Sequence, residues 1–264
     1  MGPRRDVDSV DFNLNTDSIT AVILTKNEEA NLPRALESLP RGCAVLVLDS
    51  LSTDATAQIA TTAGATIIQR EWRGYIDART FALSHVRTPW TLMIDADEAL
   101  DPTLRDAIVV AGEDADGYRV ARTTYFCGRP MRIWSDERIL RLFRTDRATL
   151  RSRAMSDNAQ VHEVWSVKGK VVDLAGTLSH YSYPTVAAYR AKFDRYTSLE
   201  AGSLRASGAK LQIEETKAWL RFLQLLMTRG AVLDGWRGAY AAWWSAWYRA
   251  VALKKSLQAH ATQK

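Results

Sequence analysis

Carboxylate side chains follow apolar segments in the first hundred residues of this 264-residue chain. Glu28 follows the first segment, Asp49 ends the second, and the Asp95-Ala96-Asp97 triplet follows the last. Hard divalent cations choose oxygen ligands and bridge phosphate oxygens, so this triplet suits a cation held at a diphosphate. Such a cation neutralises charge that develops on a diphosphate leaving group. The spacing therefore indicates metal-assisted chemistry, although acids also commonly end strands without binding a ligand.

Glycine-rich phosphate loops are absent from the sequence. Neither G-x-G-x-x-G nor G-x-x-x-x-G-K-[ST] occurs, so dinucleotide redox chemistry and P-loop hydrolysis are not expected. Phosphates must then be held in another way. Arg79 lies in a predicted helix before the last apolar segment and is placed to reach them, or else it is a solvated helix arginine.

The elements that position these residues alternate between two periods. Short, nearly continuous apolar runs predict buried strands at 19–25, 44–49, 65–69 and 90–94. Helices are predicted between them at about 30–39, 54–63 and 75–86, with Ser52 or Thr53 able to cap the second. This alternation predicts an α/β fold with a doubly wound, mostly parallel sheet. Ligands bind such a sheet at the carboxyl ends of its strands, where the carboxylates lie.

After residue 101 the pattern changes. Shorter strands are predicted at 117–122, 131–134, 138–144, 161–167 and 170–174, and helices at 185–205, 212–229 and 236–257. We therefore expect a mobile tail (1–18), a catalytic domain (19–184, divided at residue 100) and a C-terminal helical region (185–264).

Composition is that of an ordinary soluble protein, with 47% hydrophobic and 25% charged residues. Cys43 and Cys127 cannot form a disulfide framework, and no export signal precedes Ile19, so a cytoplasmic location is expected. Ten arginines lie between Arg119 and Arg153 with few acids among them. They form either solvated strand faces or a surface for an anionic acceptor, because arginine binds phosphate and carboxylate with two hydrogen bonds.

Several motifs, taken in order, resemble a known family. TKNEEANLPRALESL, VLDSLSTDATAQIATTAGA, EWRGYIDARTFAL and MIDADEAL resemble the nucleotide-sugar half of family 2 glycosyltransferases, which have the GT-A fold. RILRLFRTD, Val161-His162-Glu163, LSHYSY and LDGWRGAYAAWWSAWYRA are similar to the lipopolysaccharide core β-glucosyltransferase subgroup. The resemblance runs from Ile19 to Lys255. One departure is Leu51, which stands where the family usually has glycine and is expected to alter that turn.

The resemblance implies a role for each site residue in the nucleotide-sugar half. Thr25, Glu28 and Asp49 would border the nucleoside, with Arg79 at the nucleotide sugar. Asp95 would lie near ribose or metal, and Asp97 would be the main ligand of Mg²⁺ or Mn²⁺. The donor implied is a UDP-sugar, with glucose favoured. The acceptor implied is an anionic glycolipid or glycan at the inner membrane surface, and no nucleic acid partner is expected.

The resemblance also implies inversion by direct displacement, with a carboxylate base from the second half of the domain. Glu163 is the candidate base and Asp136 its rival, while His162 would orient Glu163 and His180 would be a further metal ligand. Glu163 is otherwise a strand-edge acid paired with arginine, and His180 a hydrogen-bonded structural residue.

The C-terminal segment places aromatic side chains on one helical face, beside basic residues. These are Tyr240, Trp243, Trp244, Trp247 and the aliphatic Val251. The face suits either a membrane interface or packing on the catalytic domain or a second subunit. Two other functions compete with the transferase: a metal-dependent phosphohydrolase with an aspartate nucleophile, and a non-catalytic protein that binds nucleotide sugars or glycolipids.

Overall fold

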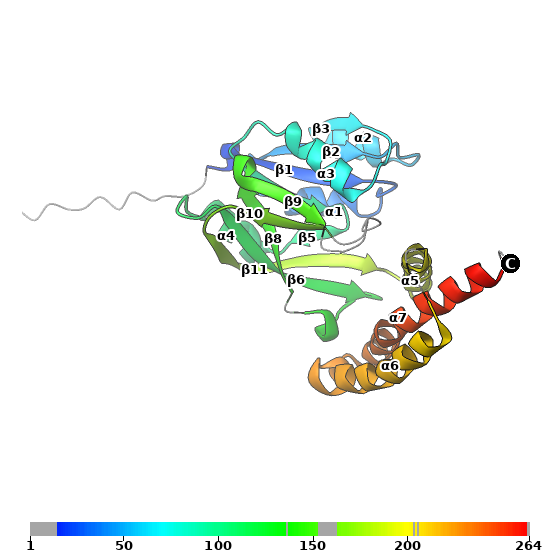
Figure 1. Ribbon diagram of the computed structural model, residues 1–264. Helices are drawn as coiled ribbons and strands as arrows, with labels where there is room; N and C mark the ends of the chain where they lie inside the picture. Colours follow the sequence, from blue (N-terminus) through cyan, green and yellow to red (C-terminus); the bar gives the residue numbers. More distant parts are fainter. Residues whose placement is uncertain (1–14, 136, 153–162, 203, 205, 263–264) are drawn as a thin grey trace, which may run out of the picture. The chain divides into compact units, whose positions relative to one another are not determined.

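The computed structural model describes residues 15–135, 137–152, 163–202, 204 and 206–262 (Figure 1). Two compact units divide the chain. The first comprises the described residues up to Val120 with Ile139–Arg151 and Val164–Thr177, and the second comprises Ala121–Arg138 and the residues from Leu178 onward. In this division residues 121–138 and 178–184 group with the C-terminal helices.

A mixed sheet of nine strands forms the scaffold within the described residues. Its central strand β1 (Ile19–Thr25) lies between parallel neighbours β2 (Ala44–Asp49) and β4 (Trp90–Asp95), and β3 (Thr66–Gln69) extends it beyond β2. The order is β3-β2-β1-β4-β8-β6-β11-β5, and β4 and β8 pair antiparallel. The remaining strands of this sheet are β5 (Glu98–Leu100), β6 (Gly117–Phe126), β7 (Arg129–Pro130), β8 (Glu137–Arg144) and β11 (Val171–Tyr183). A separate pair is formed by β9 (Ala148–Ser152) and β10 (Glu163–Val167).

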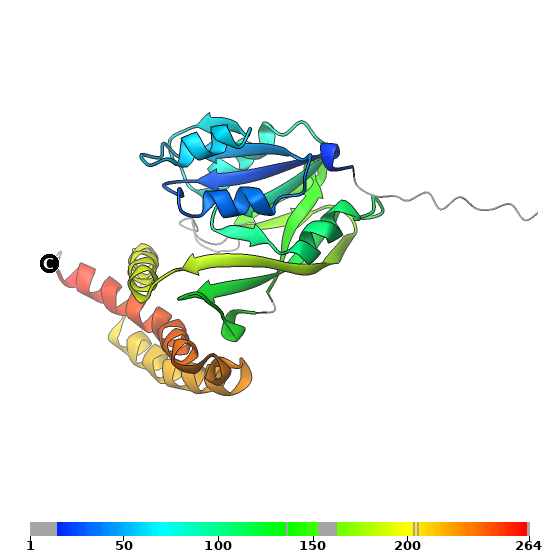
Figure 2. The same cartoon turned by 180° about the vertical axis from the view of Figure 1, so that it is seen from behind.

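Helices cover both faces of the parallel strands. In Figure 1 α3 (Tyr75–Ser84) lies in front of the sheet, whereas the view from behind shows α1 (Leu32–Ser38) in front (Figure 2). α2 (Thr56–Thr62) contacts α1. The doubly wound, mostly parallel arrangement predicted from the alternating pattern is therefore confirmed.

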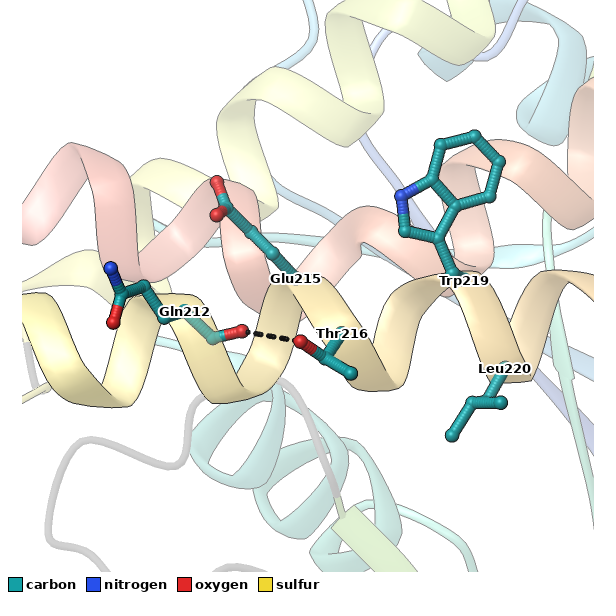
Figure 3. Close-up of a pocket in the computed structure, with 5 residues that line it drawn as sticks. All are labelled: Gln212, Glu215, Thr216, Trp219 and Leu220. Atoms are coloured by element: carbon teal, nitrogen blue, oxygen red, sulfur yellow. Dashed lines mark hydrogen bonds between the residues drawn. The ribbon is translucent and has the colours of Figure 1, made fainter.

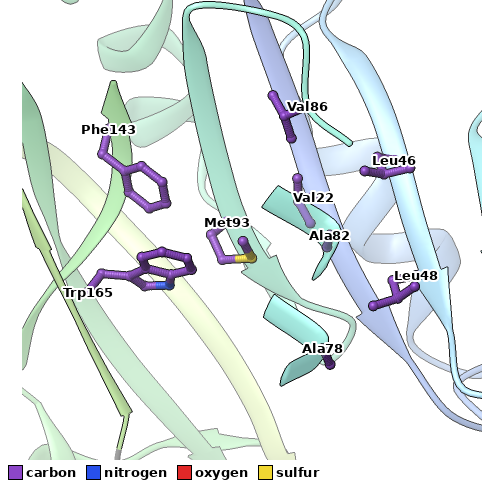
Figure 4. Close-up of a cluster of buried hydrophobic side chains, with 9 residues drawn as sticks. All are labelled: Val22, Leu46, Leu48, Ala78, Ala82, Val86, Met93, Phe143 and Trp165. Atoms are coloured by element: carbon purple, nitrogen blue, oxygen red, sulfur yellow. The ribbon is translucent and has the colours of Figure 1, made fainter. Parts of the chain in front are cut away.

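The core beneath α3 explains the sequence pattern of the strands. Val22, Leu46, Leu48 and Met93 project from β1, β2 and β4 towards Ala78, Ala82 and Val86 of the α3 segment, and Phe143 and Trp165 close the cluster (Figure 4). The rings of Phe143 and Trp165 have centroids 4.7 Å apart. Alanines at positions 78 and 82 let α3 approach the strands closely, which fixes the helix that carries Arg79.

Several short elements differ from the predictions. Residues 131–134, predicted as a strand, contain the 3₁₀ helix η2 (Arg132–Trp134). Strands β5, β7 and β9 and helix α4 (Pro102–Val109) were not predicted. Asp101 caps α4 by accepting a 2.7 Å hydrogen bond from the Leu104 amide, and Pro102 occupies the first turn, so the local signal was present. The other 3₁₀ turns are η1 (Thr16–Ser18), η3 (Thr145–Arg147) and η4 (Ala231–Asp234).

The second unit ends in three long helices, α5 (Val186–Ala201), α6 (Gly208–Thr228) and α7 (Gly235–Thr262). The aromatic face predicted on α7 is largely covered by the other two. The Trp243 ring lies 5.4 Å from that of Trp219 on α6, and the Trp244 ring lies 4.9 Å from that of Phe193 on α5. Among the helices of the described residues, none has the length and apolar character needed to cross a bilayer.

Gly176 on β11 provides a test of the packing against α4. Its φ is +87°, and an added Cβ would lie 2.2 Å from the backbone nitrogen of Leu104. Gly64 is the matched control, with φ +77° and open space around it. Gly64→Ala should cost about 1–2 kcal/mol from backbone conformation alone. Gly176→Ala should cost at least about 3 kcal/mol, because backbone must also move. Denaturant unfolding measures both, and equal losses would contradict the close contact.

Candidate active site

The polar residues at the strand ends lie at one edge of the sheet. Thr25 is the register partner of Asp49, and Leu24 is the partner of Asp95. Parallel strands that end at the same level bring the side chains after them together, as the sequence pattern predicts. Thr25, Asp49 and Asp95 therefore share the carboxyl edge of β1, β2 and β4.

Asp49 is a buried carboxylate bound by neutral donors. Oδ1 accepts from the Thr25 hydroxyl at 2.9 Å, and Oδ2 accepts from the Ser52 amide at 2.9 Å and from Gln69 Nε2 at 3.1 Å. The Ser52 hydroxyl also donates to Oδ1. Burial opposes ionisation, but the hydrogen bonds from Ser52, Gln69 and Thr25 outweigh it and hold the pKa of Asp49 below its usual value. Asp49 is therefore an anion that fixes the turn after β2.

Side chains also join the loops after β1 and β2. The Asn27 amide donates to the Ser52 hydroxyl at 2.8 Å, and Asn27 Oδ1 accepts from the Thr53 amide at 2.9 Å. The Glu28 amide donates to the Thr56 hydroxyl at 2.8 Å. Ser52 and Thr53 do not cap α2, contrary to the prediction: Asp54 accepts from the Thr56 amide instead. The Ser52 hydroxyl therefore binds Asp49 and the backbone amide of Asn27 instead of capping the helix.

Leu51 adopts the backbone conformation that glycine would adopt in this turn. Its φ is +60°, in the left-handed region, and its side chain is half exposed. The Lys26 ammonium donates to the Leu51 carbonyl at 2.7 Å and to the Ser50 carbonyl at 3.0 Å. A non-glycine residue in this conformation costs about 1–2 kcal/mol, and whether leucine alters the turn of the family stays a prediction.

Asp95 lies between two arginines. Arg79 of α3 donates to Oδ1 at 2.7 Å, and Arg141 of β8 donates to Oδ2 at 3.2 Å. Glu98 completes the group, because its carboxylate accepts from Arg141 at 2.5 Å and from the Asp95 amide at 3.0 Å. Arg79, Arg141 and Glu98 are all buried. Burial disfavours the charge on Arg141, but Glu98 and Asp95 outweigh it and raise its pKa above the usual value.

Asp97 occupies the two-residue turn between β4 and β5 and is partly exposed. Its carboxylate and that of Asp95 are hard oxygen donors at a strand end, which is the chemistry that Mg²⁺ or Mn²⁺ requires. The described residues contain no group of three side chains arranged to hold a metal. Two carboxylates still fit such a cation, because Mg²⁺ commonly takes its other ligands from substrate phosphates and water.

The remaining predicted residues belong to the later part of the chain. His180 lies on β11, with Nδ1 3.4 Å from the Thr124 hydroxyl on β6. Glu163 begins β10, but its side chain lies outside the described part of the structure, as do Asp136 and His162. The role of each stays a prediction.

At least five of the described arginines between Arg119 and Arg151 pair with acids, which favours the structural interpretation for those members. The pairs join Arg119 to Asp173 at 2.7 Å, Arg122 to Glu137 at 2.5 Å, Arg141 to Glu98, Arg144 to Glu113 and Asp116 at 3.9 Å, and Arg147 to Asp116. Arg129, Arg132, Arg138 and Arg151 are exposed, and Arg153 lies outside the described residues.

Comparison with known proteins assigns the chain to a family. The model of glycosyl transferase family 2 matches residues 20–163, which contain the strand-end residues from Thr25 to Asp97. The chain belongs to family 2 of the glycosyltransferases. It is 32% identical over 258 residues to the lipopolysaccharide core biosynthesis glycosyltransferase LpsC of Rhizobium meliloti, covering 92% of this chain and 93% of that protein.

Other similar proteins agree with this assignment. An uncharacterised glycosyltransferase of Rickettsia typhi is 32% identical over 203 residues, or 73% of this chain and 70% of that protein. A mannosyltransferase of Pyrobaculum calidifontis, solved with GDP-mannose and Mn²⁺, has a TM-score of 0.51 and 15% identity over 91% of this chain and 87% of that one. This similarity shows that the glycosyltransferase has the GT-A fold.

Sequence reasoning overlooked Arg141 and the role of Glu98 in this glycosyltransferase. Arg141 stands between Leu140 and Leu142 in an apolar strand, and a charge in such a run signals a buried partner. Glu98 directly follows the aspartate triplet. The pairing itself joins residues 43 positions apart, so no local pattern specifies it.

The Arg141–Glu98 pair should contribute strongly to stability. Glu98→Ala leaves a buried guanidinium with less compensation and should lower the free energy of unfolding by about 3–5 kcal/mol. The exposed Arg119–Asp173 pair is the matched control, and Asp173→Ala should cost less than about 1 kcal/mol. Urea denaturation compares the two variants. A loss for Glu98→Ala as small as that of the control would show that the pair is not tightly coupled.

Proposed function

We propose that this glycosyltransferase moves a hexose, with glucose favoured, from a UDP-sugar to a lipopolysaccharide core or related cell-envelope glycan, with inversion at the anomeric carbon. The shared edge of β1, β2 and β4, where Thr25, Asp49 and Asp95 converge, is the observation that carries the donor site. Similarity to LpsC over nearly the whole chain supports the class of acceptor. We propose a cytoplasmic location, peripheral on the inner membrane, because such an acceptor is anchored in lipid.

Each residue at this edge has a proposed task. Thr25, Glu28 and Asp49 border the nucleoside, and the joined loops after β1 and β2 hold them still. Asp95 fixes the Arg79 guanidinium, whose proposed task is to bind the nucleotide sugar. A fixed guanidinium binds phosphate oxygens without first losing side-chain entropy.

Asp97 and Asp95 are the proposed ligands of the divalent cation, with His180 as a further candidate. When bound, the cation offsets the negative charge of the diphosphate leaving group. Both oxygens of Asp95 already accept from arginine, so Asp95 would bind the cation within that ion-paired group.

The transfer itself is a direct displacement. The acceptor oxygen forms a bond to the anomeric carbon while the bond to the diphosphate oxygen breaks, and the hydroxyl proton passes to a carboxylate. That carboxylate must lie opposite the leaving group, which excludes Asp95 and Asp97 when they bind the cation. Glu163 is the proposed base, with Asp136 as the alternative.

The competing phosphohydrolase has no observation in its favour. Its aspartate motif usually follows the first strand of the sheet, whereas the motif here follows β4. A non-catalytic nucleotide-sugar protein would bind donor but never turn it over.

Donor and metal are tested together by thermal denaturation and transfer assays. UDP-glucose with Mn²⁺ should raise the melting temperature, with stabilisation near 2.7 kcal/mol at about a hundredfold excess over Kd. Asp97→Ala should remove that shift and abolish transfer while melting normally without ligand.

His180→Ala, titrated with Mn²⁺ alone by calorimetry, decides whether the histidine is a ligand. Stabilisation by GDP-mannose and not by any uridine nucleotide would overturn the donor, and full transfer in excess chelator would overturn the metal.

The base is tested by Glu163→Gln, which keeps the shape of the side chain and removes its basic oxygen. Transfer should fall by roughly 10²–10⁴-fold, the usual contribution of general base catalysis. Donor affinity should barely change, because the residue faces the acceptor. Asp136→Asn is the paired variant. Near-normal turnover in Glu163→Gln combined with an inactive Asp136→Asn would assign the role to Asp136.

A further inference from the structure

Helix α6 carries apolar side chains on the face that turns away from α7. Leu220 is 65% and Met227 82% exposed, and Ile213 and Leu223 are each more than half exposed. At 3.6 residues per turn these four side chains fall within about one third of the helix circumference. We call them the α6 stripe. Ala218, on the opposite side of the helix, is fully buried, so α6 packs on its neighbours through the face that carries Ala218.

Trp219 marks the edge of the stripe towards α7. Its ring packs against those of Trp243 and Trp247, with centroids 5.4 and 5.9 Å away, yet about half of the side chain stays exposed. Beside it lies a pocket lined by Gln212, Glu215, Thr216, Trp219 and Leu220 (Figure 3). Trp219 and Leu220 leave the helix in different directions (Figure 3). The indole of Trp219 is amphipathic and borders the stripe that contains Leu220.

Basic residues border the other edge of the stripe. Lys217 and Arg221 are exposed there, and both pair with Glu214, whose side chain is mostly buried. Within α6, which the structure describes throughout, the outward arc from Trp219 across the stripe to Arg221 contains no acid. The side chains between the apolar ones on this arc are basic or uncharged.

The apolar surface continues along the chain after α6. Val232 and Leu233 of η4 are largely exposed, and so is Trp236 at the start of α7. Arg229 and Arg237 lie on either side of them in the sequence. Asp234, the acid in this segment, accepts a hydrogen bond from the Ile133 amide at 3.2 Å. Exposed apolar side chains beside basic ones thus continue from α6 into η4 and the first residues of α7.

We propose that the α6 stripe is the surface by which this protein docks on a membrane, lying in the interface of an anionic bilayer. A helix with an apolar face bordered by lysine and arginine buries that face at the headgroup boundary while its cations meet anionic lipid. A second copy of the chain is the alternative occupant of this surface, and the experiment below distinguishes the two.

This surface differs from the one that the sequence suggested. Trp243 and Trp244 of α7 pack on α6 and α5, whereas the side chains of the α6 stripe stay more than half exposed. The inference deepens the proposed function. It rests on that function in one respect, namely that the proposed acceptor lies in a membrane. Vesicle binding needs neither donor nor acceptor, so its failure and a failure of transfer are distinguishable.

The test is co-sedimentation of the full chain with vesicles of phosphatidylcholine, with and without phosphatidylglycerol. The parent protein should bind the anionic vesicles, and added salt should weaken binding because it screens the charges. The triple variant Leu220→Gln, Leu223→Gln and Met227→Gln should lose at least about tenfold in partitioning. It should keep its melting temperature, because the replaced side chains are exposed. Transfer to a short, lipid-free acceptor should be unchanged.

Two controls make the result decisive. Val110→Gln replaces an equally exposed aliphatic residue at the end of α4 and should bind vesicles like the parent. Sedimentation velocity of the triple variant tests the alternative occupant. Unchanged vesicle binding by the triple variant would overturn the proposal. So would a parent dimer that dissociates in the triple variant, with no vesicle binding by either.

Discussion

The parallel register of β1 with β2 and β4 is the constraint on which the site depends. Because Thr25 lies opposite Asp49 and Leu24 opposite Asp95, the three strands end at one level and their polar termini converge. A shift of one residue in either pairing would turn every side chain of that strand to the other face. The apolar cluster beneath α3 prevents such a shift, since each of the three strands contributes to it. The placement of the proposed donor site is thus a consequence of core packing.

Two carboxylates at this edge, the buried Asp49 and the partly exposed Asp95, are stabilised in different ways. Asp49 receives hydroxyl, amide and backbone donors, so it stays charged without a counter-ion and ties the loops after β1 and β2 together. Asp95 joins Glu98, Arg79 and Arg141 in a group whose two negative and two positive charges balance. A balanced group tolerates burial and does not by itself attract a cation. In the proposed function the attraction therefore falls to Asp97 and to the diphosphate.

Local patterns predicted the parts of this fold that depend on continuous burial. The strands at 19–25 and 44–49 were predicted to the residue, because both are apolar along their whole length and end in polar turns. β5 has three residues and was too short to show a period, while 131–134 alternates like a strand but forms a 3₁₀ turn. Within the site, the convergence of strand ends was predictable from the fold class. The partners of Asp95 were not, because Arg141 comes 46 positions later and its position depends on how β8 adds to β4.

The C-terminal helices show that the sequence also does not reveal which helix faces become covered on folding. Periodicity identifies an apolar face on α7, but the sequence does not say what covers that face, and the structure shows α5 and α6 doing so. On α6 apolar residues lie on the covered face and on the exposed one, and the sequence alone does not say which of them the fold covers. Ala218 is fully buried against its neighbours, whereas Met227 and Leu220 keep most of their surface exposed after folding. Side chains that remain in water after folding contribute to burial only if another surface covers them. The basic residues that flank them then select an anionic surface over a neutral one, because charge, unlike apolar area, distinguishes between partners.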